Sequence, residues 1–157
     1  MSNALNLTAP VDTLAMEFTR DFDAPVASLF LAHADPDLLT QWLGPHGLQM
    51  EVTEWDFRAH GGYRYVHRNS EGSFVFNGTF HSVRDDEFIL QTFEFDGAPD
   101  MVNLEYLWFD DLGGGRSRLR GRAICPTPDA RDALLSSGMA DGMTQGYDKL
   151  DALLAGS

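Results

Sequence analysis

The sequence contains one cysteine, no long apolar run and no run of consecutive basic residues. Cys125 has no second cysteine with which to form a disulfide, a composition typical of proteins kept in a reducing cytoplasm. No apolar stretch approaches the roughly 18 residues of a membrane-spanning helix, and no secretory signal peptide is recognisable. We therefore expect a cytoplasmic protein that does not enter a membrane.

Positive charge is also scarce. Lysine and arginine number 11 against 24 aspartates and glutamates, which gives a formal net charge of −13. Proteins that bind nucleic acids neutralise phosphates with clustered basic side chains, and attachment to anionic lipids needs the same clusters. The composition therefore predicts neither a nucleic acid nor a membrane surface as partner.

The common signatures of metal and cofactor sites are missing as well. The five histidines lack the spacings of zinc ligands, and Cys125 lacks a CxxC partner. The sequence has no serine-centred GxSxG, no P-loop and no dinucleotide fingerprint in a βαβ context. Gly113–Gly115 lies between two expected strands and is typical of a hairpin turn. We expect no metal, no cofactor and no catalytic residue, which favours a protein that is not an enzyme.

The patterns that are present predict one folded domain. Residues 1–13 show no periodicity and are expected to form a loose lead-in, with a single domain over 14–157. Residues 15–25 alternate like a strand that Pro25 ends. Residues 26–33 have helical spacing, and a second short helix follows over 36–43. Asp35 is the expected N-cap of that helix, with Pro36 at its first position.

From residue 48 to 125 the pattern is that of strands separated by turns. Six consecutive strands with short connections predict an antiparallel meander, and a final helix is expected from Pro128 to about Leu154. The predicted order is one strand, two short helices, six strands and a long helix.

Several stretches in this order resemble the homologues of the activator of heat-shock-protein-90 ATPase, a family of the START-like (SRPBCC) superfamily. They are FDAP with VASLFLAH, WLGP, Arg58 with a Gly-Gly pair and YRY, GTF, DLGGGRSRL, and GMADGMTQGYDKLDALL. His60 stands where the family commonly has glycine. The resemblance, which covers about residues 15–155, implies an α+β helix-grip fold. In that fold a curved antiparallel sheet of about seven strands wraps around a long C-terminal helix, and a cavity commonly lies between them.

The last expected helix contains glycine at 138, 142 and 146. Each glycine destabilises a helix by about 0.5–1 kcal/mol relative to alanine, so another role must explain this line of glycines. Two interpretations remain open: the glycines permit close packing, or together with flexible methionines they form a wall of a ligand pocket. The expected cavity residues are Trp42, Tyr63, Tyr65, His67, Phe80, Met139, Gly142, Met143, Gly146 and Tyr147.

Four arginines alternate with small or apolar residues near the end of the last strand region. A period of two places them on one face of a strand. They either pair with acidic neighbours on a solvated outer face or contact an acidic protein partner. The candidates for this protein contact are Arg116, Arg118, Arg120 and Arg122.

Two carboxylates lie in apolar strands and are candidates for buried acid–base groups. For Glu105 we expect an outward position opposite Arg120, because an unpaired buried charge is costly. Matching the family's strand pattern instead points Glu105 inward. An inward Glu105 would favour an enzyme. The other carboxylate, Glu94, is expected to pair with an arginine on a neighbouring strand.

Three functional hypotheses follow. The first is binding of a small hydrophobic or aromatic ligand between sheet and helix. The second, implied by the family resemblance, is a protein-interaction module that acts on a chaperone ATPase. The third is a cyclase- or hydrolase-type enzyme. The resemblance also implies a cytoplasmic homodimer.

Overall fold

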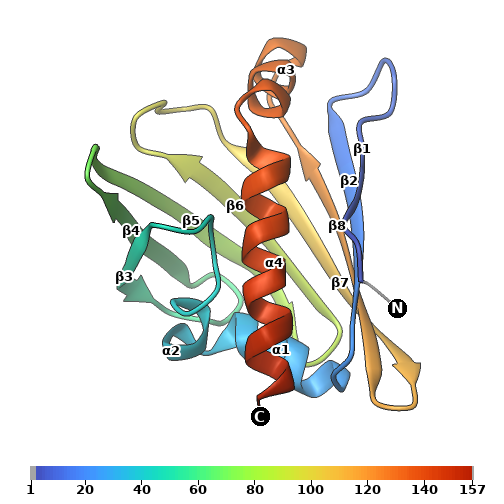
Figure 1. Ribbon diagram of the computed structural model, residues 1–157. Coiled ribbons are helices and arrows are strands. Elements are labelled where there is room, and N and C mark those ends of the chain that lie inside the picture. The colour runs from blue at the N-terminus through green and yellow to red at the C-terminus, as the bar shows by residue number, and fades with distance from the viewer. Residues whose placement is uncertain (1–2, 157) are drawn as a thin grey trace.

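One curved antiparallel sheet wraps around the last helix in the computed structural model, which describes residues 3–156 (Figure 1). The order across the sheet is β1-β2-β8-β7-β6-β5-β4-β3. The strands are β1 (Asn6–Thr8), β2 (Ala15–Phe22), β3 (Gln49–Trp55), β4 (Gly62–Asn69), β5 (Gly72–Arg84), β6 (Phe88–Phe95), β7 (Asn103–Gly113) and β8 (Arg116–Ile124). The helices are α1 (Val26–Ala34), α2 (Pro36–Leu39), α3 (Pro128–Ser136) and α4 (Met139–Ala155).

This arrangement confirms the predicted α+β helix-grip fold. The sheet has eight strands within the described residues because part of the expected lead-in is ordered: Asn6–Thr8 pairs with Glu17–Thr19 of β2. The expectation of a loose lead-in is therefore wrong for these three residues. Residues 1–2 and Ser157, also covered by the expected domain bounds, lie outside the described part of the chain.

The short second helix begins as predicted and ends early. The backbone N–H of Asp37 donates to Oδ1 of Asp35 at 2.9 Å, and Pro36 occupies the first helical position. These contacts confirm the N-cap. The helix stops at Leu39, however, and the chain continues to Trp42 through tight turns such as Gln41 N–H to Leu38 O at 3.0 Å.

The closing helix is divided in two. Gly138 adopts a left-handed conformation with φ +82°, which separates α3 from α4. Glycine reaches this conformation without a steric penalty. The prediction of one continuous helix is therefore wrong at Gly138, and only Gly142 and Gly146 lie within α4.

Helix α4 crosses the concave face of the sheet, while α1 and α2 lie at the lower end and α3 at the upper end (Figure 1). Arg20 of β2 points inward beneath α4, and its side chain is only 2% exposed. Its Nη2 lies 3.0 Å from Oδ1 of Asp148, and its Nη1 lies 3.5 Å from Oδ2 of Asp151. This ion-pair group ties α4 to the sheet.

Candidate ligand site between the sheet and the last helix

The inner face of the sheet has a closed part and a more accessible part. Toward α1 and α2 the inward side chains are buried in one core cluster that includes Trp42, Tyr63, Phe80, Phe109, Leu119 and Leu150. Toward the N-terminal half of α4 the inward side chains are only half-buried. We call this second group the upper inner face; it comprises Phe76, Gln91, Phe93, Glu105 and Leu107. Met143 of α4 is half-buried as well.

Glu105 belongs to the inner face, so its predicted outward pairing with Arg120 is wrong. In the sheet, Glu105 lies opposite Gln91 of β6 and Ala123 of β8, whereas Arg120 lies opposite Trp108. A bulge between Asp111 and Gly113 shifts the β7–β8 register. The observed partner of Glu105 lies three residues beyond the predicted one, and because side chains alternate between the two faces, a shift by an odd number turns the strand over.

The Glu105 carboxylate has one polar contact in residues 3–156. Nε2 of Gln91 donates to its Oε1 at 2.9 Å. Its other oxygen, Oε2, accepts no hydrogen bond within these residues, and no basic side chain among them forms an ion pair with the carboxylate. Burial raises the pKa of Glu105, and the hydrogen bond from Gln91 acts in the opposite direction.

Three tyrosines, Tyr63, Tyr65 and Tyr147, lie near enough to this carboxylate for its charge to raise their pKa values. Burial raises the pKa of both Tyr65 and Tyr147, and the negative charge of Glu105 raises each further. In the described part of the chain neither hydroxyl has a hydrogen-bond partner. The hydroxyl of Tyr63, in contrast, donates to the carbonyl of Thr92 at 2.6 Å. Within residues 3–156, Glu105 Oε2 and the hydroxyls of Tyr65 and Tyr147 therefore form no hydrogen bond, but they are not sealed from solvent and can exchange water for a ligand.

His67 lies on the same inward row of β4 as Tyr63 and Tyr65. Its ring is buried, and the ring centroid lies 5.1 Å from the centroid of Tyr65 and 5.6 Å from that of Phe76. Burial lowers the pKa of His67, and nearby Lys149 lowers it further, which keeps the imidazole neutral. Its Nε2 has no hydrogen-bond partner among residues 3–156.

The structure distributes the other expected cavity residues over two environments. Trp42 stacks on Tyr147 with ring centroids 5.7 Å apart, inside the closed core with Tyr63 and Phe80. Met143 packs against this core from α4, and Met139 is half-buried one turn earlier. The sequence interpretation missed Gln91, Phe76 and Phe93, although strict alternation along β5 and β6 could have placed them beside the tyrosines.

The two glycines of α4 face the loop after α2. A Cβ atom at Gly146 would lie 3.2 Å from the carbonyl oxygen of Trp42 and 3.3 Å from the nitrogen of Gly44. At Gly142 the nearest atom would be in Pro45, at 3.8 Å. Gly146 thus permits a close backbone approach, which is the first of the two interpretations of the glycine line, while Gly142 has room for a methyl group.

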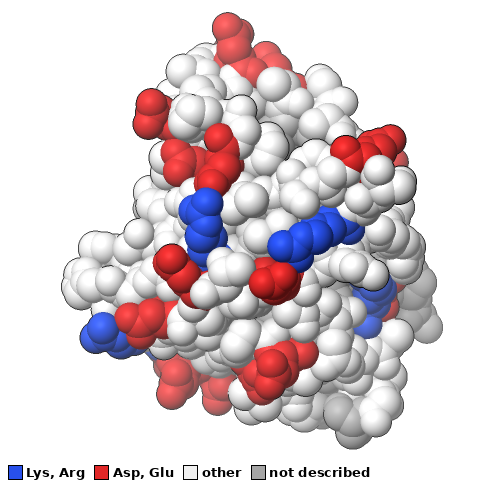
Figure 2. Space-filling view, turned by 90° about the vertical axis from the view of Figure 1, so that its left-hand side faces the viewer, with Lys and Arg blue, Asp and Glu red and all other residues white. Residues whose placement is uncertain are grey.

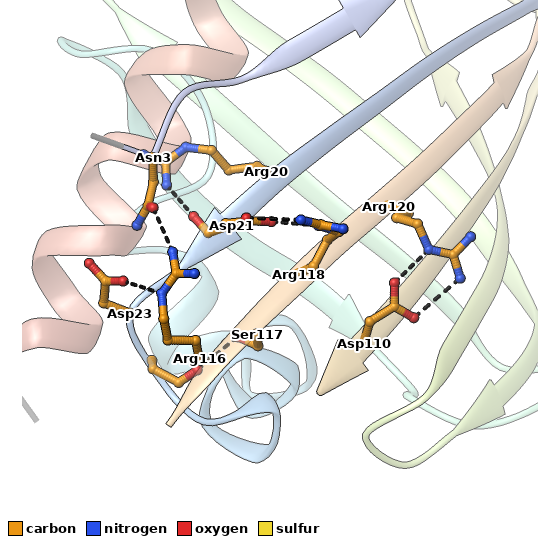
Figure 3. A network of polar contacts seen from close by, with 10 residues as sticks. Asn3, Arg20, Asp21, Asp23, Asp110, Arg116, Ser117, Arg118 and Arg120 are labelled. Carbon is orange, nitrogen blue, oxygen red and sulfur yellow. Dashed lines mark hydrogen bonds and ion pairs between the residues drawn. The ribbon is translucent and has the colours of Figure 1, made fainter. Parts of the chain in front are cut away.

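The four arginines of β8 lie on the outer face, each paired with a carboxylate. Figure 3 shows the pairs of Arg116, Arg118 and Arg120. Arg118 and Arg120 make two-pronged contacts with Asp21 and Asp110, with shortest distances of 2.6 Å in both cases. This is the paired outer face that was one of the two alternatives. The remaining pairs are Arg116 with Asp23 at 2.8 Å and Arg122 with Glu17 at 3.0 Å.

A groove of about 410 Å³ also runs along the outer face beside β1. Trp108 forms part of it, and the guanidinium carbons of Arg120 and Arg122 lie 5.1 and 5.8 Å from its ring centroid. Within residues 3–156 no group of three or more potential ligand side chains is placed to hold a metal ion. No helix in this part of the chain is long and apolar enough to span a membrane.

Comparison with known proteins connects this geometry to a family. The family model described as "Activator of Hsp90 ATPase homolog 1-like protein" matches residues 23–155. A crystal structure of a Rhodobacter sphaeroides protein is similar with a TM-score of 0.88 and 28% identity, covering 98% of this chain and 100% of the other. The AHSA1 protein of Silicibacter pomeroyi has a TM-score of 0.73 and 24% identity, with coverages of 90% and 97%. A search of curated proteins gives no significant match.

Proposed function

The chain belongs to the activator of Hsp90 ATPase homolog 1-like family, and on that premise we propose that it binds a small hydrophobic or aromatic molecule. The family's fold supports ligand binding in general. In this chain the ligand lies between the N-terminal half of α4 and the upper inner face, with Met139, Met143 and Leu107 against its apolar surface. Tyr65 and Tyr147 contact it from the side of the closed core.

One observation carries this proposal: apolar and polar side chains of the upper inner face keep accessible surface although they point toward α4. Small-molecule sites typically combine an apolar lining with a few polar groups that orient the ligand. Methionines suit such a site because their unbranched side chains adapt to different shapes. The oxygens of Glu105, Tyr65 and Tyr147 that form no hydrogen bond within residues 3–156 provide the polar groups.

Titration with N-phenyl-1-naphthylamine, a neutral dye whose fluorescence rises in apolar surroundings, tests this function. We expect saturable binding to the native protein and loss of binding in Leu107→Trp, which fills the site. Leu104→Trp is the matched control, because Leu104 lies on the same strand and points to the outer face. Equal binding by both variants, with unchanged melting temperatures, would contradict the proposed site.

A second candidate function is contact with a chaperone ATPase, the activity that the family's description names. The observation that favours it is the outer groove, where Trp108 lies beside Arg120 and Arg122. Arg116, Arg118, Arg120 and Arg122 would meet an acidic partner surface by exchanging their present carboxylate partners. Stimulation of the ATPase rate of a purified Hsp90, lost in Trp108→Ala, would favour this function over ligand binding alone.

The inward Glu105 also strengthens the enzymatic alternative, because a buried carboxyl with a raised pKa is suited to general acid–base catalysis. We place this alternative third and propose a cytoplasmic homodimer as the working form. The single buried thiol of Cys125 suits a reducing compartment. Light scattering of the purified chain at several concentrations tests the dimer.

A further inference from the structure

We propose that the site selects molecules that bring a hydrogen-bond donor or a positive charge to Glu105, and that it rejects anions. This inference rests on the proposed ligand-binding function and names the chemical class of the ligand. The recognised molecule is a small aromatic or hydrophobic compound with a hydroxyl, N–H or amine group near one end.

The hydrogen-bonding capacity of the interior supports this selection. Oε1 of Glu105 already accepts from Gln91, while Oε2 accepts nothing from residues 3–156. An ionised carboxylate can only accept hydrogen bonds, so a ligand group that replaces water at Oε2 must be a donor. The hydroxyls of Tyr65 and Tyr147 can donate or accept and can therefore serve a ligand's hydroxyl or amine as well.

The charge around Glu105 points the same way. No basic side chain in the described residues pairs with its carboxylate, so an incoming anion would meet a like charge that no neighbouring cation neutralises. Acidic side chains also dominate the face shown in Figure 2, and the whole chain carries a formal charge of −13. A site built this way discriminates through repulsion of the wrong ligand as much as attraction of the right one.

Two probes with the same aromatic skeleton make a sharp test. N-phenyl-1-naphthylamine is neutral, and 8-anilinonaphthalene-1-sulfonate adds only a sulfonate to it. For the native protein at pH 7.5 we expect the neutral probe to bind about tenfold or more tightly than the anion. Glu105→Gln should bring the two affinities together, mainly by strengthening binding of the anion, because the amide removes the charge and keeps the size of the side chain.

Glu94→Gln is the matched control. Glu94 lies on the neighbouring strand, faces outward and accepts hydrogen bonds from Asn77 and from the backbone of Asp100. Glu94→Gln changes the net charge by the same single unit as Glu105→Gln. A change in probe preference that occurs only in Glu105→Gln is therefore due to the Glu105 carboxylate and not to the net charge. An equal change in both variants would overturn the inference.

A measurement on the unmodified protein covers the case in which Glu105→Gln does not fold. 1-Naphthylmethylamine and 1-naphthoic acid are compared as competitors of the bound neutral dye, and we expect the amine to displace it at a concentration at least about tenfold lower. Equal displacement overturns the selectivity and leaves the ligand site intact. Failure of the neutral dye to bind the native protein at all overturns the proposed function and this inference with it.

Discussion

Gln91 of β6 and Glu105 of β7 face each other across the inner side of the sheet, with Nε2 and Oε1 2.9 Å apart. The Gln91 amide thus donates a hydrogen bond to a carboxylate that has no basic partner among the described residues. The raised pKa of Glu105 records the cost of this placement.

Replacing Glu105 with glutamine should stabilise the protein at neutral pH. Because the folded-state pKa is raised, the stability linked to Glu105 is complete below the unfolded pKa of about 4.3 and is lost as the pH rises through the folded value. Glu105→Gln removes that loss, so we expect a gain of about 1–3 kcal/mol in unfolding free energy at pH 7. Near pH 4 the gain should vanish. Urea denaturation at both pH values measures it, and equal gains would refute the linkage.

His33 should produce a pH dependence of the opposite sign. Its Nδ1–H donates to Leu29 O at 2.8 Å, and burial lowers its pKa to about 4. In the unfolded chain the histidine pKa is about 6.5, so the unfolded chain binds this proton at a higher pH than the folded protein does. The protein should therefore lose about 3 kcal/mol of stability as the pH falls from about 6.5 to about 4. Urea denaturation of the native protein and His33→Gln over this range isolates the effect. The same slope in both proteins would contradict the assignment.

The two glycines of α4 should respond differently to alanine. Gly142→Ala adds a methyl group with ordinary clearance to Pro45, so the protein should gain about 0.5–1 kcal/mol from helix propensity. Gly146→Ala presses a methyl group against backbone atoms of Trp42 and Gly44, and should cost about 1–2 kcal/mol. Thermal unfolding of the two variants checks this prediction. Stabilisation by Gly146→Ala would show that the loop after α2 shifts to make room for the methyl group.

The N-cap of α2 offers a local test. Asp35→Ala removes the acceptor of the Asp37 N–H and should lower the unfolding free energy by about 1 kcal/mol. Asp37→Ala is the control, since its side chain makes no hydrogen bond within residues 3–156 and lies in the first turn of the same helix. Similar losses in both variants, measured by urea denaturation, would argue against a capping role for Asp35.

The fold was predictable because its signals are local and repeat along the chain. Alternation over residues 15–25 marked β2, and Asp35-Pro36 marked the start of α2. The inner position of Glu105 was not predictable from alternation alone. It depends on the bulge at Asp111–Gly113, which is a property of the hairpin geometry.

The helical glycines illustrate the same limit. Their spacing of four marked them as special, but only the tertiary structure distinguishes the left-handed break at Gly138 from the close packing at Gly146. The contact between Gln91 and Glu105 was also not predictable, because the two residues are separated in sequence and are brought together only by the β6–β7 register. Aromatic side chains were easier to find, since alternation in one strand places Tyr63, Tyr65 and His67 together.

The most direct test of the ligand site is an NMR measurement of contacts between bound N-phenyl-1-naphthylamine and the methionine methyl groups. We expect intermolecular nuclear Overhauser effects from the dye's aromatic protons to Met143 and Met139, and none to Met101, which is 41% exposed in the β6–β7 loop. Effects confined to Met101, or saturable binding without any effect at Met143, would show that the molecule does not bind between α4 and the upper inner face.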